Sequence, residues 1–109
     1  MDSDKLADLV VATLCDLKAE SVQSLDVAHL TALTDFMVVA SGRSSRHVRA
    51  LSNSLVRRCR DAGCRPIGVE GEGVGEWVLV DLADVVIHIM LPKVREFYNL
   101  EGLWDLPAS

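Results

Sequence analysis

Asp81 and Asp84 lie three residues apart between two strand-like runs, and paired carboxylates hold divalent metals in many phosphoryl-transfer sites. A catalytic metal needs further oxygen or nitrogen ligands, and the neighbouring sequence offers no clear ones. A turn that uses the two aspartates for local hydrogen bonds accounts for the same residues. The pattern therefore favours a turn over a metal site.

A second candidate for chemistry is the segment SGRSSR, residues 41–46, at the start of an expected helix. Helix N-terminal amides together with Arg43 and Arg46 attract phosphate. The segment lacks the spacing of a Walker loop or a dinucleotide fingerprint, and serine capping explains the same letters. A nucleotidyltransferase-like phosphate- or nucleotide-binding enzyme that uses Ser41, Gly42, Ser44 and the two aspartates stays open as the alternative function. It lacks the carboxylate pair that metal-dependent transfer needs immediately after this turn.

The histidines and cysteines offer weaker signals. His88 sits among apolar strand residues, with no nucleophile or carboxylate expected opposite it, which indicates packing or an interface rather than catalysis. Cys15, Cys59 and Cys64 are an odd number without a second pair, so neither a zinc site nor a disulfide framework is expected. We expect no metal, no cofactor and a reducing cytoplasm.

The elements that position these residues begin with residues 75–90, which read as two adjacent strands joined by a tight turn at Leu82 and Ala83. Side chains alternate across a strand, which predicts three opposed pairs: Asp81 with Asp84, Leu79 with Val86 and Trp77 with His88. One face is purely apolar: Val78, Val80, Val85, Ile87 and Ile89. The other is mixed, with the aspartates at its rim: Trp77, Leu79, Val86, His88 and Met90.

A sheet needs only one apolar face to make a core, so the mixed face is typical of a surface that docks a partner. Helices that simply cover both faces remain the alternative, because doubly covered sheets are common.

The rest of the chain supplies the other elements. We expect a helix at 4–20, a strand at 22–27, a buried strand at 36–40, a helix from a capping Ser44 or Ser45 to just before Gly63, an edge strand at 64–70 and a helix at 93–103. This order predicts an α/β (α+β) fold, a mixed five-stranded sheet with packed helices, in a single domain of residues 1–109.

Composition and charge narrow the function. The 109 residues are half apolar and a quarter charged, and no apolar run approaches the roughly 20 residues that span a bilayer. Acids early in the first helix differ from a basic targeting peptide, so we expect no membrane contact and a cytoplasmic protein. The net charge of −5 argues against a general nucleic-acid binder.

The charge is unevenly distributed, because residues 43–65 hold seven basic and one acidic side chain between two acidic segments. Acidic strands with an exposed aromatic suit a basic protein partner, although a solvated surface that only aids solubility explains the charge as well. RNA contact by the basic helix ranks second, because the helix lacks interleaved aromatics.

Three motifs in order resemble the ribosomal silencing factor (Iojap) family over about residues 4–104. They are TDFMVVASG (34–42) with SSR (44–46), GEWVLVD (75–81) with DVVIH (84–88), and REFYNLE (95–101) with LW (103–104). The sequence departs mildly at Met37 and Met90, where many relatives carry larger aromatics. Both changes are apolar and leave the expected function intact.

The resemblance implies a nucleotidyltransferase-like topology without catalysis. It also implies binding to the fourteenth protein of the large ribosomal subunit, which blocks joining of the small subunit and represses translation, and a homodimer whose contact competes with the ribosome. The expected partner-binding residues combine this family pattern with the strand geometry: Trp77, Leu79 and His88 at the centre, Asp81 and Asp84 as charge partners, and Tyr98 as a flanking contact. Contact with ribosomal RNA is left open.

Overall fold

The computed structural model describes residues 1–100 and 102, which form three helices and five strands. Their order along the chain is α1 (Ser3–Asp16), β1 (Glu20–Asp26), β2 (Phe36–Ser41), α2 (Ser45–Asp61), β3 (Gly68–Glu70), β4 (Trp77–Asp81), β5 (Val85–Met90) and α3 (Pro92–Tyr98). The predicted order of elements is confirmed. None of the helices in this part of the chain is long and apolar enough to cross a membrane.

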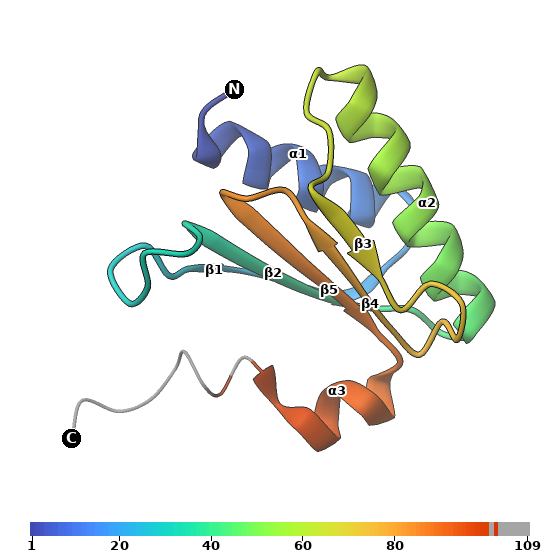
Figure 1. Cartoon of the computed structure of the whole chain (residues 1–109). Coiled ribbons are helices and arrows are strands. Elements are labelled where there is room, and N and C mark those ends of the chain that lie inside the picture. Colours follow the sequence, from blue (N-terminus) through green and yellow to red (C-terminus); the bar gives the residue numbers. More distant parts are fainter. Residues whose placement is uncertain (101, 103–109) are drawn as a thin grey trace.

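The strands form one mixed sheet in the order β1-β2-β5-β4-β3 (Figure 1). Strands β2 and β5 are parallel neighbours inside the sheet, and the other neighbouring pairs are antiparallel. A parallel pair needs a crossover connection, and α2 lies within the one that joins β2 to β5. The mixed five-stranded sheet is as predicted, with β2 as a buried interior strand.

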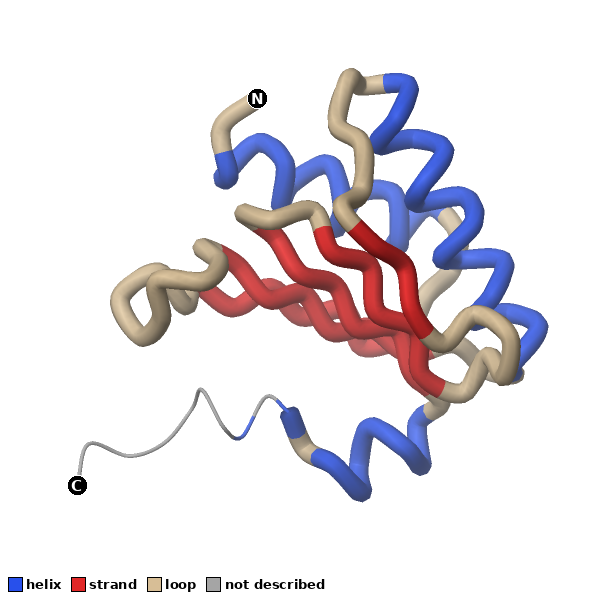
Figure 2. Tube along the Cα trace, viewed as in Figure 1, coloured by secondary structure: helices blue, strands red, loops and turns tan. Residues whose placement is uncertain are grey.

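Two layers of unequal size cover the sheet (Figure 2). Helices α1 and α2 pack side by side on one face, here named the closed face, and α3 lies on the opposite side. The closed face consists of side chains with no exposed surface: Val38, Ala40, Val78, Val80, Val85, Ile87 and Ile89. Full burial of one such valine or isoleucine contributes about 1.5 to 3 kcal/mol, so this face holds most of the core.

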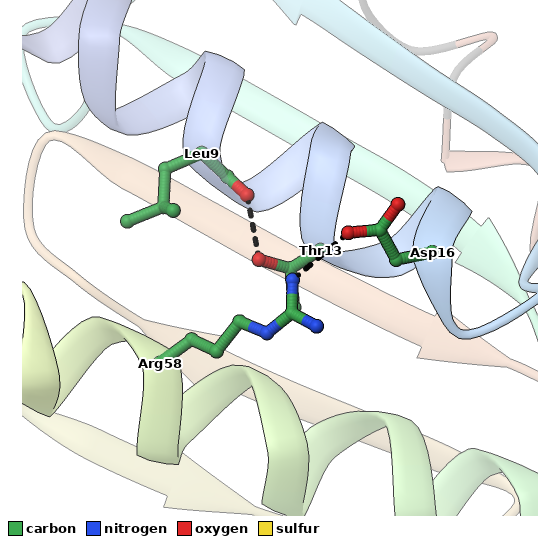
Figure 3. A network of polar contacts seen from close by, with 4 residues as sticks. All are labelled: Leu9, Thr13, Asp16 and Arg58. Carbon is green, nitrogen blue, oxygen red and sulfur yellow. Dashed lines mark hydrogen bonds and ion pairs between the residues drawn. The ribbon is translucent and has the colours of Figure 1, made fainter.

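One ion pair joins the two helices over the closed face, beside a hydrogen bond within α1 (Figure 3). The Nη1 of Arg58 in α2 lies 3.0 Å from Oδ2 of Asp16 in α1, and the two side chains are 43% and 64% exposed. The buried Thr13 hydroxyl donates a 2.8 Å hydrogen bond to the carbonyl of Leu9 within α1. The ion pair therefore lies at the solvent-exposed edge of the helix interface, and the buried hydroxyl is satisfied within its own helix.

Helix α1 ends four residues before its predicted end. Lys18 takes a left-handed conformation (φ 65°), and the Ala19 N–H reaches back to the Leu14 carbonyl at 2.9 Å. These are features of a Schellman motif, which usually has glycine at the left-handed position. Because this position holds lysine rather than glycine, no sequence signal marked the end of the helix. Helix α2 starts and stops as predicted, with Ser44 as its N-cap and left-handed Gly63 directly after its C-cap residue.

The β4–β5 register differs from the prediction by two residues. The turn centres on Ala83 and Asp84, because Ala83 takes a φ of 71° and the Leu82 N–H donates to the Val85 carbonyl at 3.0 Å. The three predicted opposed pairs were therefore wrong. The observed pairs are Trp77 with Met90, Leu79 with His88 and Asp81 with Val86. A shift of two keeps every side chain on its predicted face.

Two other elements are shorter than predicted. Strand β3 is limited to three residues at the sheet edge, after Pro66, which has no N–H to donate. Helix α3 closes at Asn99, which has a left-handed φ of 46°. Leu103, where the helix was predicted to end, and the motif residue Trp104 lie outside the described residues.

Candidate functional site

Helix α3 covers only part of the second face of the sheet. Val94 and Leu100 pack over a small buried cluster: Val27, Met37, Val39 and Met90. Met90, predicted on the docking surface, is fully buried here. Over β4 and β5 the face stays half-buried, and we name this region the open face: Trp77, Leu79, Val86 and His88, bordered by Tyr98. The alternative that helices cover both faces therefore holds only for the part of this face under α3 and Leu100.

Trp77 is the hub of the open face. Its indole Nε1–H donates a 2.9 Å hydrogen bond to Nδ1 of His88, and its ring centroid lies 4.8 Å from that of Tyr98. Phe97 stacks edge-on against Tyr98 at 5.0 Å and is 81% exposed. Three predicted partner residues, one from each of β4, β5 and α3, therefore meet at one aromatic cluster.

His88 orients this cluster as a neutral ring. Burial lowers the pKa of His88 below its ordinary value. Because Nδ1 accepts the Trp77 hydrogen bond, the imidazole proton belongs on Nε2. Its nearest cross-strand neighbours are Val39 and Leu79, neither of which can act as a nucleophile or an acid. This arrangement offers His88 no catalytic partner, and its role in a partner interface stays a prediction.

Two hollows flank His88. The larger, of about 460 Å³, is mainly apolar and ends at the loops: Thr31, Leu33, Thr34, Met37, Ile67, Asp81, Ala83, Val86 and His88. The smaller, of about 200 Å³, lies toward β3: Glu70, Gly71, Trp77, Leu79 and His88. The open face is therefore not flat, and it can receive side chains of a partner on both sides of the histidine.

Sequence reasoning missed the apolar loop residues at the far end of the larger hollow. Leu33 is 89% exposed and Ile67 is 71% exposed. Neither belongs to a regular alternation, so no periodic signal marked them. The one available hint was Ile67 directly after Pro66, where an edge strand was expected to begin.

The two aspartates at the rim have different surroundings. Asp81 lines the larger hollow, and its Oδ1 accepts a 2.8 Å hydrogen bond from the Ala83 N–H. Asp84 is exposed at the tip of the turn, where its backbone carbonyl accepts from the Asp35 and Phe36 N–H groups. Neither carboxylate pairs with a cation among residues 1–100 and 102. Both are free to meet a cation from outside, although the strand register places Asp81 opposite Val86 rather than opposite Asp84 as predicted.

The phosphate-binding candidate at residues 41–46 is occupied by contacts within the chain. Ser44 caps α2, Nδ1 of His47 accepts from the Arg43 N–H at 3.0 Å, and the Ser41 hydroxyl accepts from Nη1 of Arg95 at 3.0 Å. A Cβ on Gly42 would lie 2.7 Å from Cγ2 of Val48, so close packing accounts for the glycine. The described residues also contain no group of three or more histidine, cysteine, aspartate or glutamate side chains placed to hold a metal ion.

Comparisons with known proteins agree on one family. A family model described as "Ribosomal silencing factor during starvation" matches residues 1–108. The chain is 44% identical, over 95% of its length and 85% of the relative's, to a protein of Chromobacterium violaceum named ribosomal silencing factor RsfS. A mouse protein named "mitochondrial assembly of ribosomal large subunit protein 1" is 36% identical over 91% of this chain and 45% of its own length.

A crystal structure of a Chromobacterium violaceum protein has the same fold. It superimposes with a TM-score of 0.95 at 42% identity and covers all of this chain and 91% of its own.

Proposed function

The chain belongs to the ribosomal silencing factor family, and we propose that its open face binds the fourteenth protein of the large ribosomal subunit and so keeps the small subunit from joining. The observation that carries this proposal is the Trp77 cluster, half-buried and held by His88 and Tyr98. Tryptophan and tyrosine in such settings supply much of the binding energy of protein interfaces. The name of the mouse relative supports a large-subunit partner.

Charge supports a basic protein as the partner. Glu70 and Asp81 line the hollows beside Trp77, and Asp84 stands exposed at the nearby turn. Ribosomal proteins are rich in lysine and arginine, so these carboxylates would steer and orient the encounter. Their attraction sets association rate and register more than total affinity, which we assign to the aromatic cluster.

The proposed mechanism is occlusion rather than catalysis. A protein held on the joining surface blocks the second subunit by its volume, which requires a tight contact and no bond-making residue. The rigid anchors of the open face, fixed by strand pairing and a ring-to-ring hydrogen bond, suit that task. We place this activity in the cytoplasm.

The test is binding of the Trp77→Ala variant to purified large subunits and to the purified fourteenth protein. We expect a loss of about 2 kcal/mol or more, roughly 30-fold in Kd, because the alanine removes the hub of the cluster. Sedimentation of mixed large and small subunits should then show restored joining. Unchanged affinity of the folded variant for large subunits would contradict the proposal, and binding to subunits but not to the isolated protein would contradict the named partner.

A second variant avoids the loss of packing that accompanies Trp77→Ala. Asp84→Lys reverses an exposed charge, and we expect it to weaken binding about 3- to 10-fold at low salt. The matched control is Asp8→Lys, which makes the same change at an exposed position of α1. Equal effects of the two changes would mean that only net charge matters.

We further propose that self-association uses the open face and competes with the ribosome. Exposed Phe97 and Leu33 at its two ends would be covered in a dimer. Sedimentation of the free protein should then give a dimer that Trp77→Ala weakens in parallel with ribosome binding. A dimer that is indifferent to this change would place self-association elsewhere.

A further inference from the structure

Arginines form a stripe along the side of α2 opposite its buried residues. At about 100° per residue, five polar positions fall within one sector opposite the buried side of the helix. We name them the arginine stripe: Arg46, Arg49, Asn53, Arg57 and Arg60. The stripe runs for about 21 Å, at 1.5 Å of rise per residue. It lies on the helical layer of the closed face, so it is separate from the open face.

Most of this positive charge has no partner within the chain. Among residues 1–100 and 102, the guanidinium groups of Arg46, Arg57 and Arg60 form no ion pair and no hydrogen bond. Arg49 makes one long hydrogen bond of 3.3 Å to the Val74 carbonyl. Arg58, which points off the stripe, is the arginine of this helix that pairs with an acid. The stripe thus retains the charge that a ligand would neutralise.

Two acids lie near the C-terminal end of the stripe. Asp61 and Glu72 share a shallow groove of about 570 Å³ with Arg57 and Arg60, between α2 and the edge of the sheet. The groove also contains Asn53, whose amide can donate hydrogen bonds. A ligand with regularly spaced anionic groups could contact the arginines from above the groove while Asp61 and Glu72 stay in water.

The residue types point to phosphate. All seven basic side chains of residues 43–65 are arginine and none is lysine. One planar guanidinium group can donate two parallel hydrogen bonds to two oxygens of a phosphate, which an ammonium group cannot do. The stripe places two such groups three residues apart at each end, at roughly 5 to 6 Å between Cβ atoms. The absence of an aromatic side chain from it leaves no platform for base stacking, so contacts would be with the backbone of a nucleic acid.

A lipid surface fits less well. Helices that bind membranes insert an apolar side below the headgroups. The apolar residues of α2 are buried against the sheet instead, with Val48, Leu51 and Leu55 at most 1% exposed. A helix whose own large apolar side chains are buried can attract a charged surface through its arginines but has no apolar side to insert into it.

We propose that the arginine stripe binds the phosphodiester backbone of RNA, without sequence preference. The choice of RNA over another polyanion rests on the proposed function, since a protein that acts on a ribosomal subunit works beside exposed RNA. The overall charge of −5 opposes such binding, so the contact is weak and strongly salt-dependent. With three or four phosphates neutralised, affinity should fall about 50-fold between 50 and 200 mM salt.

The test is fluorescence anisotropy with a labelled single-stranded RNA of about 20 nucleotides and a labelled RNA duplex of about 20 base pairs. The variant R46Q/R57Q/R60Q removes three arginines that have no partner in the chain, so folding should be preserved. The control K5Q/K18Q/K93Q removes three exposed positive charges elsewhere. We expect the stripe variant to bind RNA at least about 10-fold more weakly at 50 mM salt, and the control to bind like the parent.

Four outcomes would overturn the proposal: no RNA binding by the parent at 50 mM salt, equal binding by the stripe variant, equal losses in both variants, or binding to phosphatidylglycerol vesicles without binding to RNA. Failure of the proposed function is distinguished by Trp77→Ala, which should keep RNA binding while losing the fourteenth protein. The stripe variant should do the reverse with these two isolated ligands.

Discussion

The closed and open faces are built from the same strands, yet they differ in almost every property. On β5, Val85, Ile87 and Ile89 point to the closed face and are wholly buried, whereas the alternate residues Val86 and His88 stay half-exposed. A closed face needs only volume and apolarity, so β-branched aliphatics suffice. The open face carries an indole–imidazole hydrogen bond that adds little to a core but fixes the direction of an anchor. Successive residues of β5 thus lie alternately on a face that stabilises the fold and on a face that we propose for recognition.

The adjacent residues Ile87 and Val86 provide the sharpest comparison of the two faces. Ile87→Ala should lower the free energy of unfolding by about 3 kcal/mol or more, because it leaves a cavity beneath α1 and α2. Val86→Ala removes two methyl groups from a half-exposed side chain and should cost about 1 kcal/mol or less. Urea unfolding followed by circular dichroism measures both.

Binding should show the opposite order in this pair of variants. Val86 lines the larger hollow, so its truncation should weaken docking, while folded Ile87→Ala should dock like the parent. If Val86→Ala destabilises the protein as much as Ile87→Ala does, the open face is part of the core and the contrast between the faces is wrong.

This contrast was largely readable from the sequence, because face assignment depends only on alternation. The error of two residues in the hairpin register left it intact. The register itself was not readable, since Leu82-Ala83 and Ala83-Asp84 are equally plausible turns when neither contains glycine or asparagine. The structure places the turn at Ala83 and Asp84, with Ala83 at a positive φ that an alanine in the sequence does not indicate.

Other features of the site needed three-dimensional information. The ring contact between Trp77 and Tyr98 joins β4 to α3, which follows β5 in the chain. No local sequence pattern predicts where α3 crosses the face of the sheet. The partial cover that buries Met90 and leaves Leu79 half-exposed follows from the same crossing. The assignment of these residues to partner binding stays a prediction.

His88 makes the open face sensitive to pH, and the closed face offers no equivalent group. Burial holds the pKa of His88 below its ordinary value of 6.5, so the unfolded chain binds the proton more readily than the folded chain. The stability from this residue is therefore complete above about pH 6.5 and is lost as the pH falls toward and through the folded pKa. The slope should not exceed about 1.4 kcal/mol per pH unit.

The check is a set of urea titrations from pH 7.5 to about 5 on the parent and on His88→Gln, which has no proton to gain in this range. We expect the difference in slope between the two proteins to appear below about pH 6.5. Docking should weaken over the same interval, because a protonated Nδ1 can no longer accept from Trp77 and the new positive charge opposes a basic partner. Parallel pH profiles for the two proteins would assign the effect to other groups.

The smallest expected effect concerns the edge of the helical layer, where the closed face meets water. Arg58 and Asp16 form the ion pair between α1 and α2, and both side chains are largely exposed, so solvent and salt screen their attraction. A double-mutant cycle of Arg58→Ala and Asp16→Ala should give a coupling of only about 0.2 to 1 kcal/mol, shrinking toward zero at 1 M salt. A salt-independent coupling above about 2 kcal/mol would mean that the pair is desolvated when the helices pack, and that the layer is held by charge as well as by apolar burial. Since Arg58 lies beside the arginine stripe but off it, the single variant should leave RNA binding unchanged. The same protein sample therefore separates an arginine that holds two helices together from the arginines that we assign to RNA.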